Sequence, residues 1–276
     1  MSWSGDLYLT ERAVILSIGY ELLQGRVINT NATYISRKLS LLGYEVKAII
    51  SVGDNYNDIG KALDFAINAL GARIVITTGG LGPTHDDITA DAIAKYFRKK
   101  LVLNKEAYEM IRSKYESAGM EMTESRVKMA LLPEGSKPIP NSVGTAPGIH
   151  LRLELVELFA LPGVPKEMEA MFEQYVEPIL RARTGIQISE GYLEVMGVPE
   201  SGIAPLIKAI AKKYPIYLKS HPQLHEIESP LVKVYIMATD KERSKARSLC
   251  LEACRDLENK LRTLKEAKII RSCECS

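Results

Sequence analysis

The densest group of residues that could do chemistry is the segment 77–87, whose sequence is TTGGLGPTHDD. Its glycines would let backbone N–H groups approach an anion closely, as in phosphate-binding loops. These glycines are Gly79, Gly80 and Gly82. The adjacent carboxylates of Asp86 and Asp87 would repel a phosphate unless a cation such as Mg²⁺ neutralised the pair. The segment therefore predicts a site for a phosphate and a divalent metal ion.

The same segment also has a purely structural interpretation. Thr84 and Asp87 stand three positions apart, as in a capping box, and acids stabilise the first turn of a helix. A glycine-rich turn alone is weak evidence for phosphate binding. We favour the functional interpretation because the glycines and the acid pair lie between a predicted strand and a predicted helix, where open α/β sheets bind ligands.

Two further loops place polar side chains directly after predicted strands. In the segment 19–31, GYELLQGRVINTN, Glu21 could act as a metal ligand or a general base. Asn31 could hydrogen-bond a sugar or a base, although N-cap duty is an equally good explanation for an asparagine here. Asp54 follows the next strand, where an Asx turn is its commoner role.

A later pair of loops supplies more candidates for ligand binding. The segments 141–148, NSVGTAPG, and 161–165, LPGVP, would reach the same edge of a doubly wound sheet. Turn chemistry by itself would explain both of them. The candidates are Asn141, Gly144, Thr145, Pro162 and Gly163.

Composition argues against several classes of function. The chain has 36 Lys and Arg against 34 Asp and Glu and no basic stripe, so nucleic acid and membrane surfaces are not expected partners. It has no G-x-S-x-G elbow and no P-loop, which disfavours a serine hydrolase and a P-loop NTPase. No apolar run approaches the ~18 residues of a membrane span, and residues 1–11 lack the apolar core of a signal peptide. A cytoplasmic location is therefore expected.

The four cysteines all lie within residues 250–275, where they cannot cross-link the preceding part of the chain. This distribution favours a reducing compartment. We expect Cys250 and Cys254 to lie on a helix face, and Cys273 and Cys275 to belong to a loose tail.

Short apolar runs alternate with amphipathic stretches over the first two thirds of the chain, which is typical of βαβ units with a mostly parallel sheet. This pattern predicts strands at 13–19, 44–52, 73–78 and a hairpin at 149–161. It predicts helices at 29–42, 58–70, 87–98, 105–118, 125–132 and 166–183, the last divided near Pro178. Residues 133–148 are expected to form an irregular loop. The fold class is therefore α/β, with a three-layer, mostly parallel sheet.

Beyond about residue 186 the pattern changes to that of a small α+β domain. We expect strands at 192–196, 216–219 and 231–238, with helices at 200–213 and 240–262. The predicted domains are thus 1–186, which binds the nucleotide or phosphate, and 187–276. The second domain has no glycine-rich anion loop and no acid pair after a strand, so the candidate site belongs to the first.

Five of these segments occur in the same order in a known family. SIGYELLQGRVINTN, SVGDN, TTGGLGPTHDD, NSVGTAPG and LPGVP make the chain similar to the CinA (competence/damage-inducible) family over about residues 13–180. The resemblance implies the molybdopterin-binding fold that is shared by MogA, MoaB, gephyrin and the N-terminal domain of eukaryotic FAD synthases. It also implies the small α+β domain that follows in CinA proteins. It does not extend to the deamidase domain of full-length bacterial members.

The resemblance also implies an activity, because members of the family are described as metal-dependent hydrolases of ADP-ribose and related nucleotide diphosphates. Glu21 and His85 are our own candidates for the base, on chemical grounds. The resemblance assigns the glycines of the segment 77–87 and the acid pair to the binding of phosphate and a metal, which we expect to be Mg²⁺, Mn²⁺ or Co²⁺, and it places Glu21 beside them. It places Asn31, Asp54, Gly144 and Pro162 around them. Where many relatives carry acids, this chain has Tyr20 and Asn29, so metal affinity is expected to differ.

Other proteins with this fold bind molybdopterin, so the fold does not decide the substrate. The alternative function is therefore a molybdopterin or adenylyl-molybdopterin carrier without turnover. In both cases the partner is a small nucleotide or a pterin phosphate. We also expect a homo-oligomer, with a dimer favoured over a trimer, because residues 231–238 are apolar at nearly every position and their second face needs cover.

Overall fold

The protein is described from a computed structural model, which covers residues 11–223 and 230–276. The expectation about a signal peptide falls mostly on residues 1–10, outside the described residues. The described chain divides into two compact units. The larger unit comprises residues 11–40 and 44–184, and the smaller unit comprises residues 41–43, 185–223 and 230–276.

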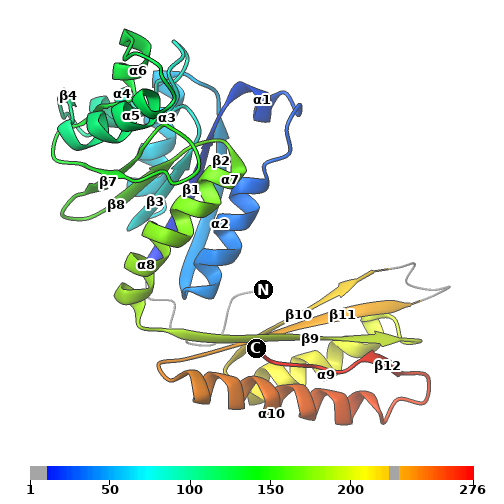
Figure 1. The fold of residues 1–276 in the computed structure, drawn as a ribbon. Coiled ribbons are helices and arrows are strands. Elements are labelled where there is room, and N and C mark those ends of the chain that lie inside the picture. Colours follow the sequence, from blue (N-terminus) through cyan, green and yellow to red (C-terminus); the bar gives the residue numbers. More distant parts are fainter. Residues whose placement is uncertain (1–10, 224–229) are drawn as a thin grey trace. The chain divides into compact units, whose positions relative to one another are not determined.

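A six-stranded sheet forms the centre of the larger unit (Figure 1). Its strands are β1 (Glu11–Ile18), β2 (Tyr44–Val52), β3 (Ile74–Thr78), β6 (Lys137–Ile139), β7 (Gly148–Arg152) and β8 (Glu157–Leu161). The order is β2-β1-β3-β8-β7-β6, in which the first four strands are parallel and β7 is antiparallel to both of its neighbours, β8 and β6. Every residue of β3 and β8 is buried, as expected for central strands of a parallel sheet with both faces covered. The mostly parallel sheet predicted from the sequence is confirmed.

Helices cover both faces of this sheet, so the larger unit has three layers (Figure 1). One face carries α2 (Thr30–Leu41), α7 (Pro165–Met171) and α8 (Glu177–Thr184), and the other carries α3 (Tyr56–Asp64), α4 (Thr89–Tyr96) and α5 (Lys105–Ser117). On the second face, Ile59, Ile93 and Ile111 join Val14 and Val75 in one buried cluster. Short elements fill the connections: α1 (Tyr20–Leu23), β4 (Leu101–Leu103), α6 (Glu124–Lys128) and β5 (Leu131–Pro133).

Two expectations for the larger unit are wrong in detail. The helix predicted over 125–132 ends at Lys128, because residues 131–133 pair with β4 instead. The loop 133–148 is not wholly irregular, since Lys137–Ile139 pairs with β7. Both short strands depend on pairing partners elsewhere in the chain, which local periodicity cannot reveal.

The helix predicted over 166–183 divides as expected before Pro178. A π-helical turn, η2 (Phe172–Val176), separates α7 from α8, and Pro178 is the second residue of α8. A proline in a first turn removes an N–H group that would lack a helical partner anyway, so it is tolerated there. A similar π-helical turn, η1 (Phe65–Ala69), ends α3.

A buried ionic cluster lies at the amino end of β8, where the chain enters the sheet. The Glu157 side chain is 4% exposed, and its Oε1 lies 2.7 Å from Nε2 of His150. Arg183 donates from Nη1 to the other oxygen at 2.5 Å. The hydrogen bond with His150, with help from the charge of Arg183, holds the pKa of Glu157 below its ordinary value in spite of burial. The carboxylate is thus a charged part of the structure.

The smaller unit is a four-stranded antiparallel sheet with two helices on one face (Figure 1). Its elements are β9 (Gln187–Met196), α9 (Glu200–Lys213), β10 (Ile216–Pro222), β11 (Leu231–Asp240), α10 (Arg243–Leu261) and β12 (Lys268–Arg271). The sheet order is β10-β11-β9-β12. Along β9 and most of β11, buried residues alternate with less buried ones, so one sheet face packs on the helices. The predicted order β-α-β-β-α is present, followed by a strand that was not predicted.

The cysteines correct a third expectation, that residues 273–275 form a loose tail. Cys250 is bonded to Cys275 and Cys254 to Cys273, so the segment after β12 is cross-linked to α10. Cys250 and Cys254 do lie on the buried face of α10, as predicted. The late position of the cysteines in the sequence was therefore a poor guide, because the fold returns the last residues to the helix.

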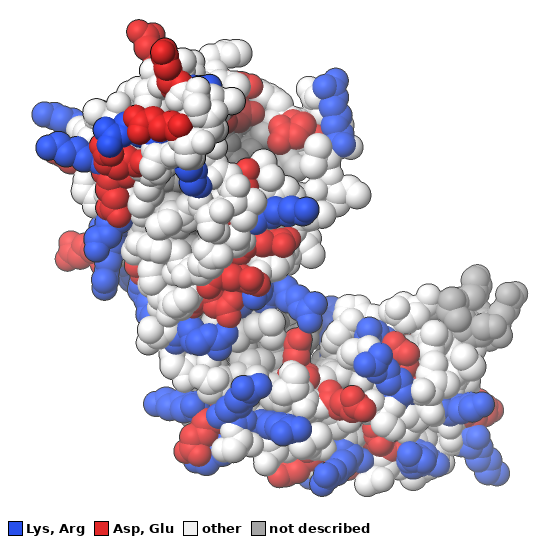
Figure 2. All heavy atoms as spheres, viewed as in Figure 1, with Lys and Arg blue, Asp and Glu red and all other residues white. Residues whose placement is uncertain are grey.

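Charged side chains are mixed in sign on each unit. In Figure 2, Lys and Arg alternate with Asp and Glu on the visible face, with no continuous area of one charge. None of the helices among the described residues is both long enough and apolar enough to cross a membrane.

Candidate functional site

The candidate site lies at the carboxyl ends of β1, β2, β3 and β8, which meet at one edge because the four strands are parallel. Contacts join the loops that follow them. Asn31 donates from Nδ2 to the carbonyl of Gly163 at 2.8 Å, and the N–H of Tyr20 donates to Asp54 at 3.1 Å. A Cβ atom on Gly163 would lie 3.5 Å from the Cα atom of Gly79. The structure therefore brings together candidates that are up to 132 positions apart in the sequence.

The glycine loop after β3 has a backbone that other residues could not adopt. Gly79 has φ +99°, and a Cβ atom there would lie 2.1 Å from the carbonyl oxygen of Ile18. Gly80 has φ +67°, and its Cβ atom would lie 2.2 Å from Oγ1 of Thr89. That hydroxyl donates to the carbonyl of Gly79 at 2.8 Å, and the N–H of Thr89 donates to the carbonyl of Gly80 at 3.1 Å. The start of α4 thus holds the loop in place.

The N–H groups of this loop are candidates for binding a ligand. Those of Gly80, Leu81 and Gly82 make no hydrogen bond within the part of the chain that the structure describes. The loop leads towards the amino end of α4, where the helix dipole favours an anion. Phosphate-binding sites in proteins usually combine unpaired N–H donors with the start of a helix.

The two aspartates that follow have different structural roles. Asp87 accepts a hydrogen bond from the N–H of Thr84 at 2.9 Å, and its own N–H donates to the carbonyl of Thr84 at 3.2 Å. The bond from Thr84 to the Asp87 side chain is one half of a capping box, but the N–H of Asp87 binds the Thr84 carbonyl and not its hydroxyl. The pair therefore stabilises a turn before α4 and does not cap that helix, whose N-cap is Ile88. Asp86 is exposed, and its carboxylate accepts no backbone hydrogen bond from another residue within the described chain.

Both carboxylates nevertheless converge on one group. The Thr84 hydroxyl lies 2.5 Å from Oδ1 of Asp86 and 2.5 Å from Oδ2 of Asp87. The hydrogen bond from Thr84 lowers the pKa of Asp86, which keeps that group ionised. Paired carboxylate oxygens with open solvent beside them suit Mg²⁺, which typically binds one or two carboxylates, substrate phosphates and water. Asp86 and Asp87 therefore fit the metal that the sequence predicts.

The other acids of the site lie around this pair. Glu21 bends over Gly19, where a Cβ atom would lie 2.3 Å from its Oε1. Burial, opposed by the hydrogen bond from Tyr20, raises the pKa of Asp54, and the negative charges of Glu21 and Asp86 raise it further. These acids do not form a compact set of metal ligands. Within the described residues, the group that brings at least three potential ligand atoms close together consists of cysteines.

His85 is less well placed than Glu21. Its side chain is 99% exposed, and its Nδ1 lies 3.9 Å from Asp86. Neighbouring groups therefore do little to fix its orientation in the absence of a ligand.

Asn31 shows the clearest sign of a missing partner. Its residue exposure is 8%, and its Oδ1 atom is buried without a hydrogen-bond partner among the described residues. A buried acceptor left unpaired costs about 1–3 kcal/mol, so a ligand or a water molecule is expected to fill this position. Asn29, by contrast, is used within the fold, since its Oδ1 accepts from the N–H of Ala32 at 3.1 Å.

The loop 141–148 is organised by hydrogen bonds within the protein. Asn141 accepts from the N–H groups of Val143 and Gly144 at 3.1 and 2.7 Å, and it donates to Glu167 at 2.7 Å. Glu167 covers Gly144, where a Cβ atom would lie 2.1 Å from its carboxyl carbon. Asn141 therefore shapes this loop, whereas the half-buried Thr145 and the exposed Gly163 remain open to a ligand.

Two lysines complete the surroundings, and the sequence analysis missed both. Lys114 of α5 donates to the carbonyls of Asn141 and Gly144, and Lys128 of α6 donates to the carbonyl of Thr84. Burial lowers the pKa of Lys114. Each lysine reaches its partner across 27 to 44 positions, so no local motif marks it.

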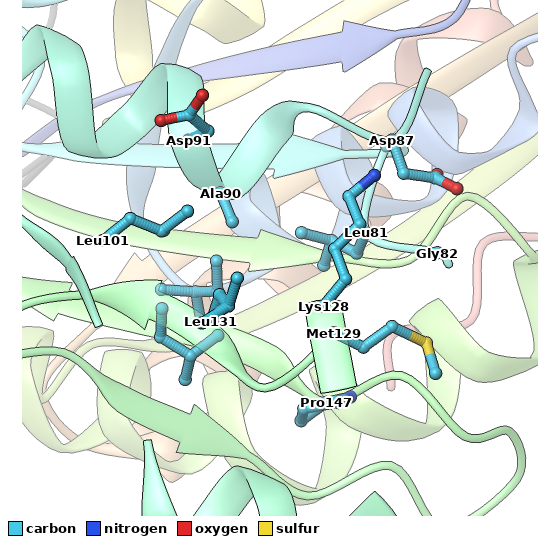
Figure 3. Close-up of a pocket in the computed structure, with 13 residues that line it drawn as sticks. Leu81, Gly82, Asp87, Ala90, Asp91, Leu101, Lys128, Met129, Leu131 and Pro147 are labelled. Atoms are coloured by element: carbon cyan, nitrogen blue, oxygen red, sulfur yellow. The ribbon is translucent and has the colours of Figure 1, made fainter. Parts of the chain in front are cut away.

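A small cavity lies directly below the glycine loop (Figure 3). Its volume is about 40 Å³, and its walls are mostly apolar, with Asp87 and Lys128 close together at one end. The residues that line it include Leu81, Ala90, Met129 and Pro147. Such a volume holds only a few water molecules, so a nucleotide would have to bind on the open side of the loop.

These features define a class of protein: an α/β domain with a glycine loop of unpaired N–H groups and an acid pair at a parallel-sheet edge. The chain belongs to a family whose model is described as "Probable molybdopterin binding domain", which matches residues 14–182. A solved structure of the protein CinA, of unknown function, from Thermoplasma acidophilum is 39% identical, with a TM-score of 0.57. It covers 61% of this chain and 98% of its own length. The resemblance to CinA is confirmed.

Uncharacterised archaeal proteins are similar over most of the chain. One from Pyrobaculum aerophilum is 48% identical over 243 residues, covering 87% of this chain and 91% of the relative. One from Aeropyrum pernix is 46% identical over 245 residues, covering 88% and 90%. The similarity to both thus includes much of the smaller unit as well as the molybdopterin-binding domain.

Proposed function

We propose that the protein is a metal-dependent pyrophosphohydrolase that acts on ADP-ribose-like nucleotide diphosphates. One observation carries this proposal: three unpaired N–H groups of a glycine loop lie beside two carboxylates that converge on a single hydroxyl. The N–H groups can bind a phosphate, and the carboxylates can bind a hard cation on the same phosphate.

The chain's own residues would divide the work as follows. The loop N–H groups of Gly80 to Gly82 and the start of α4 would hold one phosphate, while Asp86 and Asp87 would hold Mg²⁺, Mn²⁺ or Co²⁺. A bound divalent ion supplies charge neutralisation and lowers the pKa of water. The Oδ1 atom of Asn31 would accept a hydrogen bond from a sugar hydroxyl or a base N–H group.

In the proposed reaction a water oxygen attacks one phosphorus atom and the bridging P–O bond breaks, giving AMP and a sugar phosphate. The water proton must pass to a base. Glu21 and His85 are the two candidates, and Glu21 is favoured because its carboxylate lies over Gly19, next to Ile18, whose carbonyl oxygen lies against Gly79. His85 extends into solvent.

A carrier of molybdopterin or adenylyl-molybdopterin is the second candidate. The family match favours it, because the family is described by molybdopterin binding. The same loop would then bind the terminal phosphate of the pterin without turnover.

Incubation of the full chain with a panel of dinucleotides, with and without Mg²⁺, Mn²⁺ or Co²⁺, tests both candidates. Metal-dependent release of AMP that is lost in Asp86→Ala supports the hydrolase. If no panel member yields AMP and molybdopterin binds tightly, the carrier is correct instead. Glu21→Gln and His85→Gln distinguish the bases, since loss of the acidic limb of the pH–rate profile, where the rate rises as the base loses its proton, identifies the base in one variant.

A further inference from the structure

The four cysteines of the smaller unit come from two segments that the fold holds together. Cys250 and Cys254 are one turn apart on α10, and Cys273 and Cys275 are alternate residues of the segment after β12. In each pair the two side chains point in the same direction, because residues four apart lie on one face of a helix and residues two apart lie on one side of an extended chain. The two pairs therefore face each other.

The sulfur atoms form one cluster and not two separate bridges. Sγ of Cys254 lies 3.5 Å from Sγ of Cys275, to which it is not bonded. The Sγ atoms of Cys250, Cys254 and Cys275 all lie within 4.8 Å of one another. Cys273 belongs to the same cluster through its bond to Cys254.

Gly191 of β9 provides the space for this cluster. A Cβ atom at that position would lie 3.1 Å from Sγ of Cys273 and 3.2 Å from Sγ of Cys275. It would also lie 2.6 Å from the carbonyl oxygen of Glu274. A side chain on this central strand would therefore push the sulfur atoms away from the sheet.

The surroundings of the cluster are buried and apolar. Cys250, Cys254 and Cys275 are 0%, 2% and 6% exposed, and they belong to the buried cluster that includes Leu193 and Leu257. Four sulfur donors in an apolar setting suit Zn²⁺ and other thiophilic ions, and disfavour Mg²⁺. In a tetrahedral site with Zn–S bonds of about 2.3 Å, the sulfur atoms stand about 3.8 Å apart. The separation between Cys254 and Cys275 is close to this value already.

We propose that the cluster is a zinc site in the reduced protein, in which all four cysteines bind one Zn²⁺ as thiolates. The two disulfides and the zinc site are then alternative states of the same four sulfur atoms. The proposal is independent of the function proposed for the larger unit.

The chemistry of the conversion balances with a dithiol as the reductant. Two dithiol molecules reduce the two disulfides by thiol–disulfide exchange, giving four cysteine thiols and two oxidised dithiols. Binding of Zn²⁺ then displaces four protons, one from each thiol. The bonded sulfur atoms must move apart, whereas Cys254 and Cys275 need little movement.

Other contacts hold the segment in position after reduction. The N–H of Cys273 donates to Oε1 of Glu258 at 2.7 Å, and the hydroxyl of Ser189 donates to the carbonyl of Ser276 at 2.8 Å. The N–H of Ser276 donates to the carbonyl of Glu190 at 3.1 Å. Because these hydrogen bonds do not involve sulfur, the thiols are expected to stay near the positions that zinc requires.

The test is a titration of the reduced full chain with Co²⁺ under anaerobic conditions, after removal of the reductant and a count of four free thiols. We expect thiolate-to-cobalt charge transfer and the strong visible bands of a tetrahedral ion to saturate at one Co²⁺ per chain bound by cysteine, and Zn²⁺ to displace that ion. The double variant Cys273→Ser, Cys275→Ser should lose affinity by more than the roughly 100-fold that loss of an outer-shell partner can cost. Ser272→Ala, in the same segment, should bind normally.

Two results would overturn the proposal. One is a folded, fully reduced chain, by circular dichroism, that gives no thiolate-to-cobalt band. The other is an undiminished band in the double variant. Asp86→Ala must leave the band unchanged, so that cobalt bound to the carboxylates of the larger unit is not mistaken for the cysteine site.

Discussion

The two adjacent aspartates make separable contributions to stability and to the proposed activity. Asp87→Ala removes the acceptor for the N–H of Thr84, a contact of 2.9 Å that resembles an N-cap bond. Loss of such a bond costs about 1 kcal/mol. For a domain of this size that corresponds to a fall of about 2–4 °C in the melting temperature. Asp86→Ala removes an exposed carboxylate that supports no backbone group of another residue, so we expect no change in melting temperature.

Activity, unlike stability, should respond in the same way to both substitutions. Both substitutions remove a carboxylate that would bind the metal, so both should abolish metal-dependent release of AMP per folded molecule. The assay combines thermal unfolding by circular dichroism with AMP release at saturating Mg²⁺ or Mn²⁺, well below the melting temperature. Asp58→Ala serves as the control, because it is an exposed first-turn aspartate of α3, outside the proposed metal pair.

If Asp86→Ala is as active as the parent protein, the metal-binding role is refuted and the pair has only a structural role in the turn before α4. The proposed separation of the two contributions is also refuted if Asp86→Ala lowers the melting temperature as much as Asp87→Ala does. Full activity of Asp87→Ala per folded molecule would assign the metal to Asp86 and other acids.

Four more predictions follow from the structure. Gly79→Ala should prevent folding or lower the free energy of unfolding far more than Gly25→Ala does. At Gly25 the added Cβ atom meets nothing, so only the φ of +67° costs stability, about 1 kcal/mol. Urea unfolding measures both variants. The folded-state pKa of Glu157 is depressed, so its ionised carboxylate stabilises the folded protein above the unfolded pKa of about 4.5, and this stabilisation is lost as the pH falls through the folded value. Glu157→Gln should therefore flatten the acid side of a plot of melting temperature against pH. The two disulfides span 25 and 19 positions, and in the chain-entropy model their reduction should destabilise the smaller unit by about 3 kcal/mol for each loop. Calorimetry should show this as a lower unfolding temperature for that unit alone. Sedimentation equilibrium should give a mass above the 30.6 kDa of one chain, because alternate residues of β11 lie on the sheet face without helices; a constant 30.6 kDa would refute the oligomer.

The sequence predicted the parallel sheet and the position of the glycine loop, because both depend on local signals. The strand at residues 44–52 and the helix at 200–213 were predicted to the residue, since their apolar periodicity and end signals agree. The four short strands β4, β5, β6 and β12 were missed, because three or four residues carry too little pattern and their pairing is not local.

The candidate site was predictable where backbone conformation requires a particular residue. Gly79 and Gly80 are examples, because positive φ values and close neighbours exclude a side chain. The roles of Lys114 and Lys128 were not predictable, because each depends on where a distant helix packs. The disulfides were missed for a related reason, since spacing along the sequence says nothing about which segments the fold returns to α10.

The position of β3 in the sheet has a consequence for how the protein is made. One neighbour, β1, is synthesised before it, but the other, β8, begins at Glu157, 79 residues after Thr78. At about 5–20 residues per second, a ribosome needs roughly 4–16 seconds to reach that strand. During this time the apolar edge of β3 can pair with other chains. Slow translation between the two strands should therefore increase aggregation of the nascent protein, and a chaperone that covers a strand edge should reduce it.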